Sequence, residues 1–218
     1  PIGGIRRADL MKTANQQGNK GITAFILISF FLCLPLVQYR LNSQSLPLIH
    51  QDDFSENLGW TFLEGEWKIT GNRLTQYNTA YGNSNCYFKI FQSRNLDFEW
   101  EVVMHDGILD AGLHFFSSNG YLSERGNSYL VWQFKNGFVI YKTMVNHLRE
   151  VRRFPGLTEK GKLYKNRVRY NSETGLIIIE QDNKEIGRWT DPSPLRRGDF
   201  ISFRTNKTYA SFSNLKIY

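Results

Sequence analysis

The chain has 218 residues and carries 27 Lys plus Arg against 20 Asp plus Glu, a formal net charge of +7. From residue 50 onward it holds 22 basic and 19 acidic residues, so the charge of that part is only +3. This modest excess gives little support for nucleic-acid binding, and the two cysteines, Cys33 and Cys86, are too few for a disulfide framework.

Residues 21–39 read GITAFILISFFLCLPLVQY and contain no charged side chain. A helix needs about 17 to 25 apolar residues to span the hydrocarbon core of a bilayer, so this segment predicts a transmembrane helix. Basic residues outnumber acidic ones before it, and the positive-inside rule then places the N-terminus in the cytoplasm. These flanking charges are Arg6, Arg7, Lys12 and Lys20 against Asp9.

A cleaved signal peptide is the alternative interpretation, because it also joins a charged start to an apolar run. The residues after the run, Val37 to Arg40, lack the small side chains of a cleavage site. We therefore expect a single-pass signal anchor in the cytoplasmic (inner) membrane. The predicted parts are a cytoplasmic tail (1–20), the transmembrane helix (21–39), a linker (40–51) and a periplasmic or otherwise extracytoplasmic β-sandwich domain (52–218).

From Trp60 onward the sequence has the two-residue periodicity of β-strands. Leu96 to Met104 alternates apolar and acidic side chains, and the Asn136-Gly137 pair is a strong hairpin signal. Eleven or twelve short strands at regular spacing predict an all-β fold, an antiparallel two-sheet jelly-roll sandwich. Within it, Cys86 is expected to be a small buried hydrophobic residue.

Both ends of this strand-rich region carry motifs of a known type of domain. They are Asp52–Phe54, Gly59-Trp60 and Gly65–Leu74 at the start, and Gly198–Phe203 and Ala210–Ile217 at the end. These motifs resemble concanavalin A-like jelly rolls of the laminin-G and DUF1080 (3-keto-disaccharide hydrolase-like) type. The resemblance covers residues 52–218 and implies that the last strand returns beside the first.

The resemblance also marks where hydrolase relatives carry their chemistry. Asp110–Phe116 stands in the place of an Asn-Ser-Gly-Ile-x-Phe-Arg-like strand, with the Asn, Ser and Arg changed. Tyr129–Phe134 stands where Tyr-Glu-x-Gln-Ile-x-Asp is usual, and Leu130 replaces the Glu. Because the acidic positions are largely lost, the resemblance does not imply hydrolase activity here.

Asp97, Glu99 and Glu101 alternate along one strand, as the two carboxylates of laminarinase-like glycosidases do. The residues between them are apolar and fit a core, so we interpret the three acids as a solvated outer face.

A cluster of basic residues is the most prominent charge feature. Eight cations and two acids lie between Arg149 and Arg169. Such a cluster is suited to anionic lipid or an acidic partner, although alternating cations also form the wet face of a strand or protect a sheet edge. The candidate contacts are Arg149, Arg152, Arg153, Lys165, Arg167 and Arg169.

Other candidate sites are less complete. The four histidines lack zinc-ligand spacing, although His105 with Asp106 and Asp110 with His114 are pairs that a hairpin could bring together. The resemblance suggests a structural Ca²⁺ near the paired termini, with Asp52 or Asp53 and Asn214 as ligands. Most aromatic residues must fill the core, and the exceptions we name as candidates for glycan stacking are Tyr121 and Trp132.

The sequence therefore predicts first a non-enzymatic accessory or scaffolding subunit of a larger membrane protein complex, with photosynthetic or respiratory complexes as one class of host. The alternative is a membrane-tethered carbohydrate-binding module or glycoside hydrolase-like protein. Adhesion to lipid or peptidoglycan through the basic cluster is a third hypothesis.

Overall fold

A computed structural model describes residues 46–218, and residues 1–45 lie outside this description. The predicted tail, the predicted transmembrane helix (21–39) and Cys33 all fall outside it. None of the described residues forms a helix with the length and apolar character that crossing a membrane requires.

Thirteen strands make up the described part of the chain, and every pair of neighbouring strands is antiparallel. The fold is the predicted all-β jelly-roll sandwich. The strands are β1 (His50–Asp52), β2 (Thr61–Glu64), β3 (Trp67–Ile69), β4 (Leu74–Gln76), β5 (Ser84–Ser93), β6 (Asn95–Ser117), β7 (Ser128–Phe134), β8 (Gly137–Met144), β9 (His147–Pro155), β10 (Leu163–Asn171), β11 (Leu176–Gln181), β12 (Lys184–Thr190) and β13 (Arg197–Ile217).

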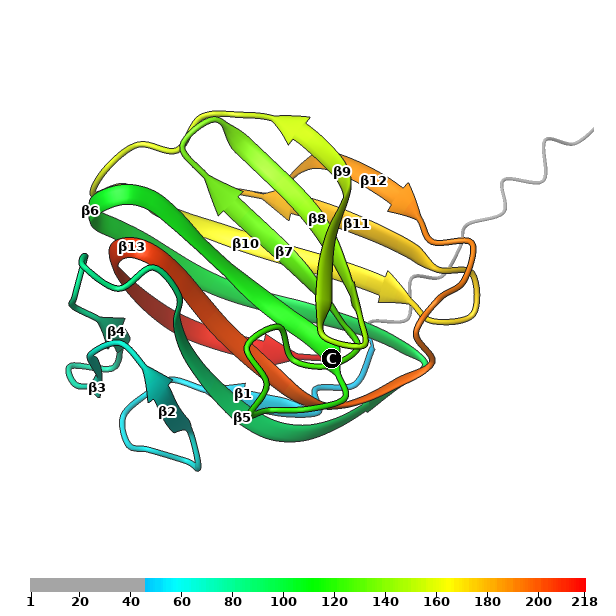
Figure 1. Cartoon of the computed structure of the whole chain (residues 1–218), viewed down its shortest axis with the longest axis horizontal. Helices are drawn as coiled ribbons and strands as arrows, with labels where there is room; N and C mark the ends of the chain where they lie inside the picture. Colours follow the sequence, from blue (N-terminus) through cyan, green and yellow to red (C-terminus); the bar gives the residue numbers. More distant parts are fainter. Residues whose placement is uncertain (1–45) are drawn as a thin grey trace, which may run out of the picture. The chain divides into compact units, whose positions relative to one another are not determined.

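Two long strands, β6 and β13, pair with each other and run through both layers of the sandwich (Figure 1). We call one layer the front sheet; it continues through β7, β8 and β9 on one side and through β5 and β2 on the other. The back sheet continues from the other halves of β6 and β13 through β10, β11 and β12, and through β4 and β3. The two motifs at the end of the sequence, Gly198–Phe203 and Ala210–Ile217, belong to the single strand β13.

The passage between the sheets depends on a local bend in each long strand. Gly107 has φ +91°, and a Cβ atom there would lie 1.9 Å from the carbonyl oxygen of Lys207. Lys207 itself has φ 44°. Because only glycine adopts such a conformation at no steric cost, Gly107 allows β6 to bend where it crosses β13.

The core lies between the sheets and is rich in aromatic rings. Phe203 stacks on Phe212 with ring centroids 4.2 Å apart, and Trp60 stacks on Phe203 at 5.5 Å. The predicted inward face of β6, from Leu96 through Val102, belongs to this core. Cys86 is fully buried as predicted, and burial raises the pKa of its thiol well above the usual value.

The last strand returns beside the first described strand, as the resemblance implied. His50 to Asp52 of β1 pair with Leu215 to Ile217 at the end of β13. The Asn136-Gly137 turn joins β7 to β8, so the predicted hairpin is confirmed. Trp67–Ile69 pairs with Leu74–Gln76 in a second hairpin.

Candidate functional site

The outer face of the front sheet carries a small pocket of about 200 Å³. Alternation along β6, β7 and β13 sends every second side chain to this face, opposite the core. The apolar lining consists of Leu130, Trp132, Tyr141 and Leu148, and the polar lining consists of Asn83, Asp110, Arg204 and Asn206. We call this the front pocket.

Gly112 of β6 lies between two residues that line the pocket. It pairs with Arg204 on one side and with Trp132 on the other. Because Gly112 has no side chain, these two flanking groups approach each other above it, with the guanidinium carbon of Arg204 5.9 Å from the Trp132 ring centroid. A Cβ atom on Gly112 would lie 2.8 Å from Trp132 Cε3 and 2.4 Å from the Val131 carbonyl oxygen.

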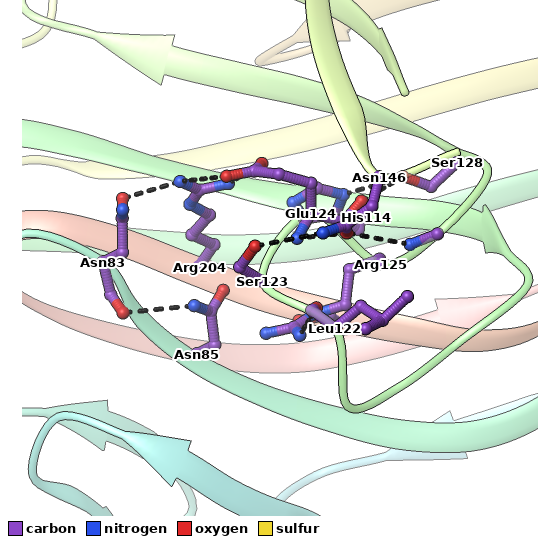
Figure 2. A network of polar contacts seen from close by, with 12 residues as sticks. Asn83, Asn85, His114, Leu122, Ser123, Glu124, Arg125, Ser128, Asn146 and Arg204 are labelled. Carbon is purple, nitrogen blue, oxygen red and sulfur yellow. Dashed lines mark hydrogen bonds and ion pairs between the residues drawn. The ribbon is translucent and has the colours of Figure 1, made fainter. Parts of the chain in front are cut away.

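Arg204 is held by acceptors from two distant parts of the chain (Figure 2). Its Nη1 donates to Glu124 Oε2 at 2.5 Å, and its Nη2 donates to Asn83 Oδ1 at 2.6 Å and to Glu124 Oε1 at 3.3 Å. The Arg204 side chain is 8% exposed and that of Glu124 is 18% exposed. Both oxygens of Glu124 are thus engaged by one cation, which fixes the guanidinium at the pocket wall.

The loop between β6 and β7 supplies Glu124 and is fastened to the front sheet. Arg125, next in sequence, is fully buried, and its Nε donates to Ser202 Oγ at 3.1 Å. The Arg125 side chain also donates to the carbonyl of Leu122, and burial lowers its pKa to about 10. The side-chain oxygen of Asn146, in the β8–β9 turn, accepts from the backbone N–H of Glu124 at 2.9 Å.

His114 lies beneath this loop and is fully buried. Its Nδ1 is 3.2 Å from Ser128 Oγ, whereas its Nε2 is buried with no hydrogen-bond partner among the described residues. Burial, assisted by the nearby cations Arg204 and Arg125, lowers the pKa of His114 well below its usual value. The ring is therefore neutral at pH 7 and helps to form the support of the loop.

Among residues 46–218, Asp110 is the only carboxylate that lines the front pocket. Burial raises the pKa of this group, and the amide of Asn206 and the indole of Trp132 offset the effect in part. Asn206 Nδ2 donates to Asp110 Oδ2 at 3.4 Å. In the described part of the chain no basic side chain pairs with Asp110, so its oxygens can accept hydrogen bonds from a ligand.

The carboxylates around the front pocket differ from the paired arrangement of the common glycosidases. Glycoside hydrolases of the common kinds use two carboxyl groups that flank the scissile bond. Glu124 is bound by Arg204 and does not line the pocket, so Asp110 has no second carboxylate there.

The two aromatic candidates differ in their placement. Trp132 lines the front pocket but is 8% exposed, so it is more buried than the open ring that glycan stacking requires. It packs in a small cluster with Leu130 and Val139, separate from the main core. Tyr121 is 69% exposed, with its ring edge against Tyr87, and does not line the pocket.

The six candidate contacts of the basic cluster lie on two strands in different sheets. Lys165, Arg167 and Arg169 are on β10, where cross-strand acids face them. Arg167 pairs with Asp97 and with Glu99, at 3.4 Å from the latter. On the same strand, Arg169 forms an ion pair with Glu180, and Lys165 lies 3.9 Å from Glu101.

The pairing of β10 with β6 and β11 brings an acid beside each cation of this half, so these residues fit the alternative interpretation, the wet face of a strand, and their role as partner or lipid contacts stays a prediction. Asp97, Glu99 and Glu101 lie opposite the core as predicted, since the alternate residues of the strand are in the core, but Asp97 is only 8% exposed and is not solvated. Arg149, Arg152 and Arg153 lie on β9, an edge of the front sheet.

The proposed calcium ligands already have other partners. Asp52 Oδ1 accepts from the Phe54 N–H at 2.7 Å, and Oδ2 accepts from Trp60 Nε1 at 2.8 Å. The Asn214 amide donates to Glu101 at 2.6 Å. Among residues 46–218 no group of three or more His, Cys, Asp or Glu side chains is arranged to hold a metal ion.

His105 and Asp106, one of the histidine–acid pairs named from the sequence, have different partners. His105 Nε2 is 2.9 Å from Ser211 Oγ, and Asp106 forms an exposed ion pair with Lys160 at 2.7 Å.

Sequence reasoning missed Asn83, Glu124, Arg204 and Asn206 as site residues. The only local signal was the polar alternation of Ser202, Arg204 and Asn206 along β13, opposite a face of apolar residues.

Three solved structures with similar folds are distant from this chain in sequence. No known family profile matches the chain, and no curated protein matches it. Carbohydrate-binding module CBM66 from Bacillus subtilis superposes with a TM-score of 0.62 at 19% identity, over 72% of this chain and 93% of that one. A Bacillus subtilis protein of unknown function with a galectin-like fold gives 0.64 at 11% identity, over 78% and 95% of the two chains.

A seed lectin from Lotus tetragonolobus gives a TM-score of 0.56 at 12% identity, over 78% of this chain and 96% of the lectin. At these identities the comparisons establish the fold, a lectin-like jelly roll.

Proposed function

We propose that the chain is a glycan-binding protein whose front pocket holds one neutral sugar residue. The observation that carries the proposal is the combination of Asp110, with no cationic partner, and the fixed Arg204 beside an apolar wall. Sugar hydroxyls donate to a carboxylate, and the apolar side chains can cover the C–H groups of the ring. Such sites are concave and mostly apolar, with a few polar groups that fix orientation.

The charge of the pocket supports a neutral ligand. Arg204 is neutralised by Glu124, so the pocket offers an anionic acceptor and no free cation. An anionic sugar would meet the Asp110 carboxylate without a compensating charge. We therefore expect uronic acids and sialic acids to be rejected.

The size supports one residue over a long chain. A volume of about 200 Å³ lies below the ~300–1,000 Å³ of sites that take drug-sized ligands. The rest of a bound oligosaccharide would extend over the outer face of the front sheet.

The fold comparisons agree with this proposal, since a carbohydrate-binding module and a lectin share the architecture. The sequence ranked an accessory subunit of a membrane complex first and glycan binding second. We propose the reverse order on the basis of the front pocket, while a membrane tether at residues 21–39 and a role beside a membrane complex stay predictions.

Binding of the labelled full chain to an array of neutral and acidic oligosaccharides tests the proposal. We expect a signal with neutral glycans and none with uronic or sialylated ones. Absence of binding to every neutral glycan, or binding to acidic glycans alone, would contradict it. Incubation with the best glycan should leave it intact, and release of reducing ends would place the protein among the hydrolases.

A further inference from the structure

A second cleft, of about 650 Å³, opens between the β8–β9 hairpin and the end of β12. Trp189 of β12 and Pro192 line one side, and Met144 and Val151 line the other. Its lining shares no residue with the front pocket. We call it the edge cleft, because β9 and β12 are the outermost strands of the two sheets.

The edge cleft has a fixed, electrically neutral floor. Lys142 Nζ lies 2.6 Å from Asp191 Oδ2, with both side chains largely buried, and also donates to the Ser193 carbonyl at 2.6 Å. Tyr129 donates its hydroxyl to the same Asp191 oxygen at 2.5 Å. These bonds satisfy the buried charges internally, so a ligand need not neutralise them.

The rim of the edge cleft is positive. Glu150 is paired with Arg153 at 2.7 Å, which leaves Arg149 and His147 with no acidic partner in the described part of the chain. Both side chains line the cleft and are exposed. A carboxylate at this rim would meet a cation that nothing in the described structure neutralises.

The strand at the rim also has open backbone groups. Within residues 46–218, β9 pairs with β8 alone, so its other edge is unpaired. Exposed strand edges bind extended peptides by main-chain hydrogen bonds, while adjacent pockets take alternate side chains. A lipid surface offers no backbone that could form hydrogen bonds with this strand edge. Lys165, Arg167 and Arg169 already pair with acidic side chains, so they do not extend a flat basic face for lipid.

We propose that the edge cleft binds an extended acidic segment of a partner protein, with an apolar side chain of that segment inserted between Met144 and Trp189. Its carboxylates contact Arg149 and His147, and its backbone lies along β9. Charge complementarity of this kind accelerates association and selects the partner.

Fluorescence anisotropy of the full chain with a labelled nine-residue peptide that alternates glutamate and leucine tests this proposal. The control peptides replace glutamate by lysine, or leucine by serine. We expect the acidic apolar peptide to bind about tenfold more tightly than either control, and its affinity to fall with added salt. Equal binding of the lysine peptide, or no binding of the acidic one, would overturn the proposal.

Matched variants locate the site. Arg149→Glu and Met144→Glu should each weaken peptide binding by about tenfold. Two control variants should change peptide binding by about twofold or less. Arg152→Glu makes the same charge change on the same strand but outside the lining, and Val145→Glu changes a residue beside Met144 that is 78% exposed. If Arg152→Glu weakened peptide binding as much as Arg149→Glu, the attraction would be non-specific and binding in the edge cleft would be refuted.

An experiment with lipid vesicles distinguishes peptide binding from membrane binding at this rim. Sedimentation with phosphatidylglycerol vesicles should not distinguish the wild-type chain from Arg149→Glu. A loss of vesicle binding in that variant, with peptide binding unchanged, would assign the rim to membranes and overturn the proposal.

Discussion

Removing Arg204 should destabilise the domain far more than removing an exposed arginine of similar pairing. In the native protein the Arg204 side chain is 8% exposed and binds Glu124 and Asn83 with three hydrogen bonds. Breaking a buried ion pair from one side costs about 3–5 kcal/mol, because the other charge stays buried without a partner. Because the Glu124 side chain is 18% exposed to solvent, we expect the cost of Arg204→Ala to lie at the lower end of this range, at about 3 kcal/mol.

The assay is urea unfolding of the full chain, supported by thermal unfolding. For a domain of this size, about 3 kcal/mol corresponds to a fall in Tm of about 6–12 °C. Arg153→Ala is the control: its pair with Glu150 also has a 2.7 Å contact, but the side chains are 51% and 42% exposed, so the cost should stay below about 1 kcal/mol. Replacing both partners, with Arg204→Met and Glu124→Leu, should restore part of the stability. Equal losses for Arg204→Ala and Arg153→Ala would refute the reasoning.

Three further outcomes follow from the same region. Gly112→Ala should cost about 1–3 kcal/mol by overpacking and weaken sugar binding, whereas Gly82→Ala, whose Cβ would make an ordinary contact 3.9 Å from Asn206 Oδ1, should cost much less stability; equal effects in urea unfolding would contradict this. The native pKa of His114 lies below its unfolded value, so the unfolded chain binds more protons below about pH 6.5, and the free energy of unfolding should hold above that pH and decrease below it. The pKa values of the partly buried His50 and His105 are also lowered, so both contribute with the same sign to the slope of the unfolding free energy against pH. His114→Gln should therefore reduce this slope, and an unchanged slope would exclude His114 as one of its sources. In a Cys33→Ser background, Cys86 should react with iodoacetamide only after unfolding, and fast native labelling would disprove its burial.

Local patterns in the sequence were sufficient for the strands and turns. The alternation from Leu96 to Met104 and the Asn136-Gly137 pair each depend on neighbouring residues, and both match the structure. The sequence could not show that β6 continues to Ser117 and passes from one sheet to the other, because that depends on a bend at Gly107 against Lys207, which is distant in sequence.

The front pocket could not be assembled from sequence for the same reason. Asn83, Glu124 and Arg204 meet only because β5, the β6–β7 loop and β13 are brought together by long-range pairing. Conversely, Arg153 and Lys165 are close in sequence, but their strands belong to different sheets. Proximity along the chain therefore suggested one basic cluster where the structure has an edge strand and a paired ladder.

The affinity of the strongest glycan for the wild-type chain and for Asp110→Asn, measured by titration calorimetry, tests the central claim most directly. Hydrogen bonds to a charged group contribute about 1.5–3 kcal/mol, so the variant should lose about tenfold to a hundredfold in affinity. Asp106→Asn makes the same change on the same strand, but Asp106 pairs with Lys160 at the surface and lies outside the pocket. The account predicts a large loss for Asp110→Asn and none for Asp106→Asn, and an unchanged affinity in Asp110→Asn would contradict it.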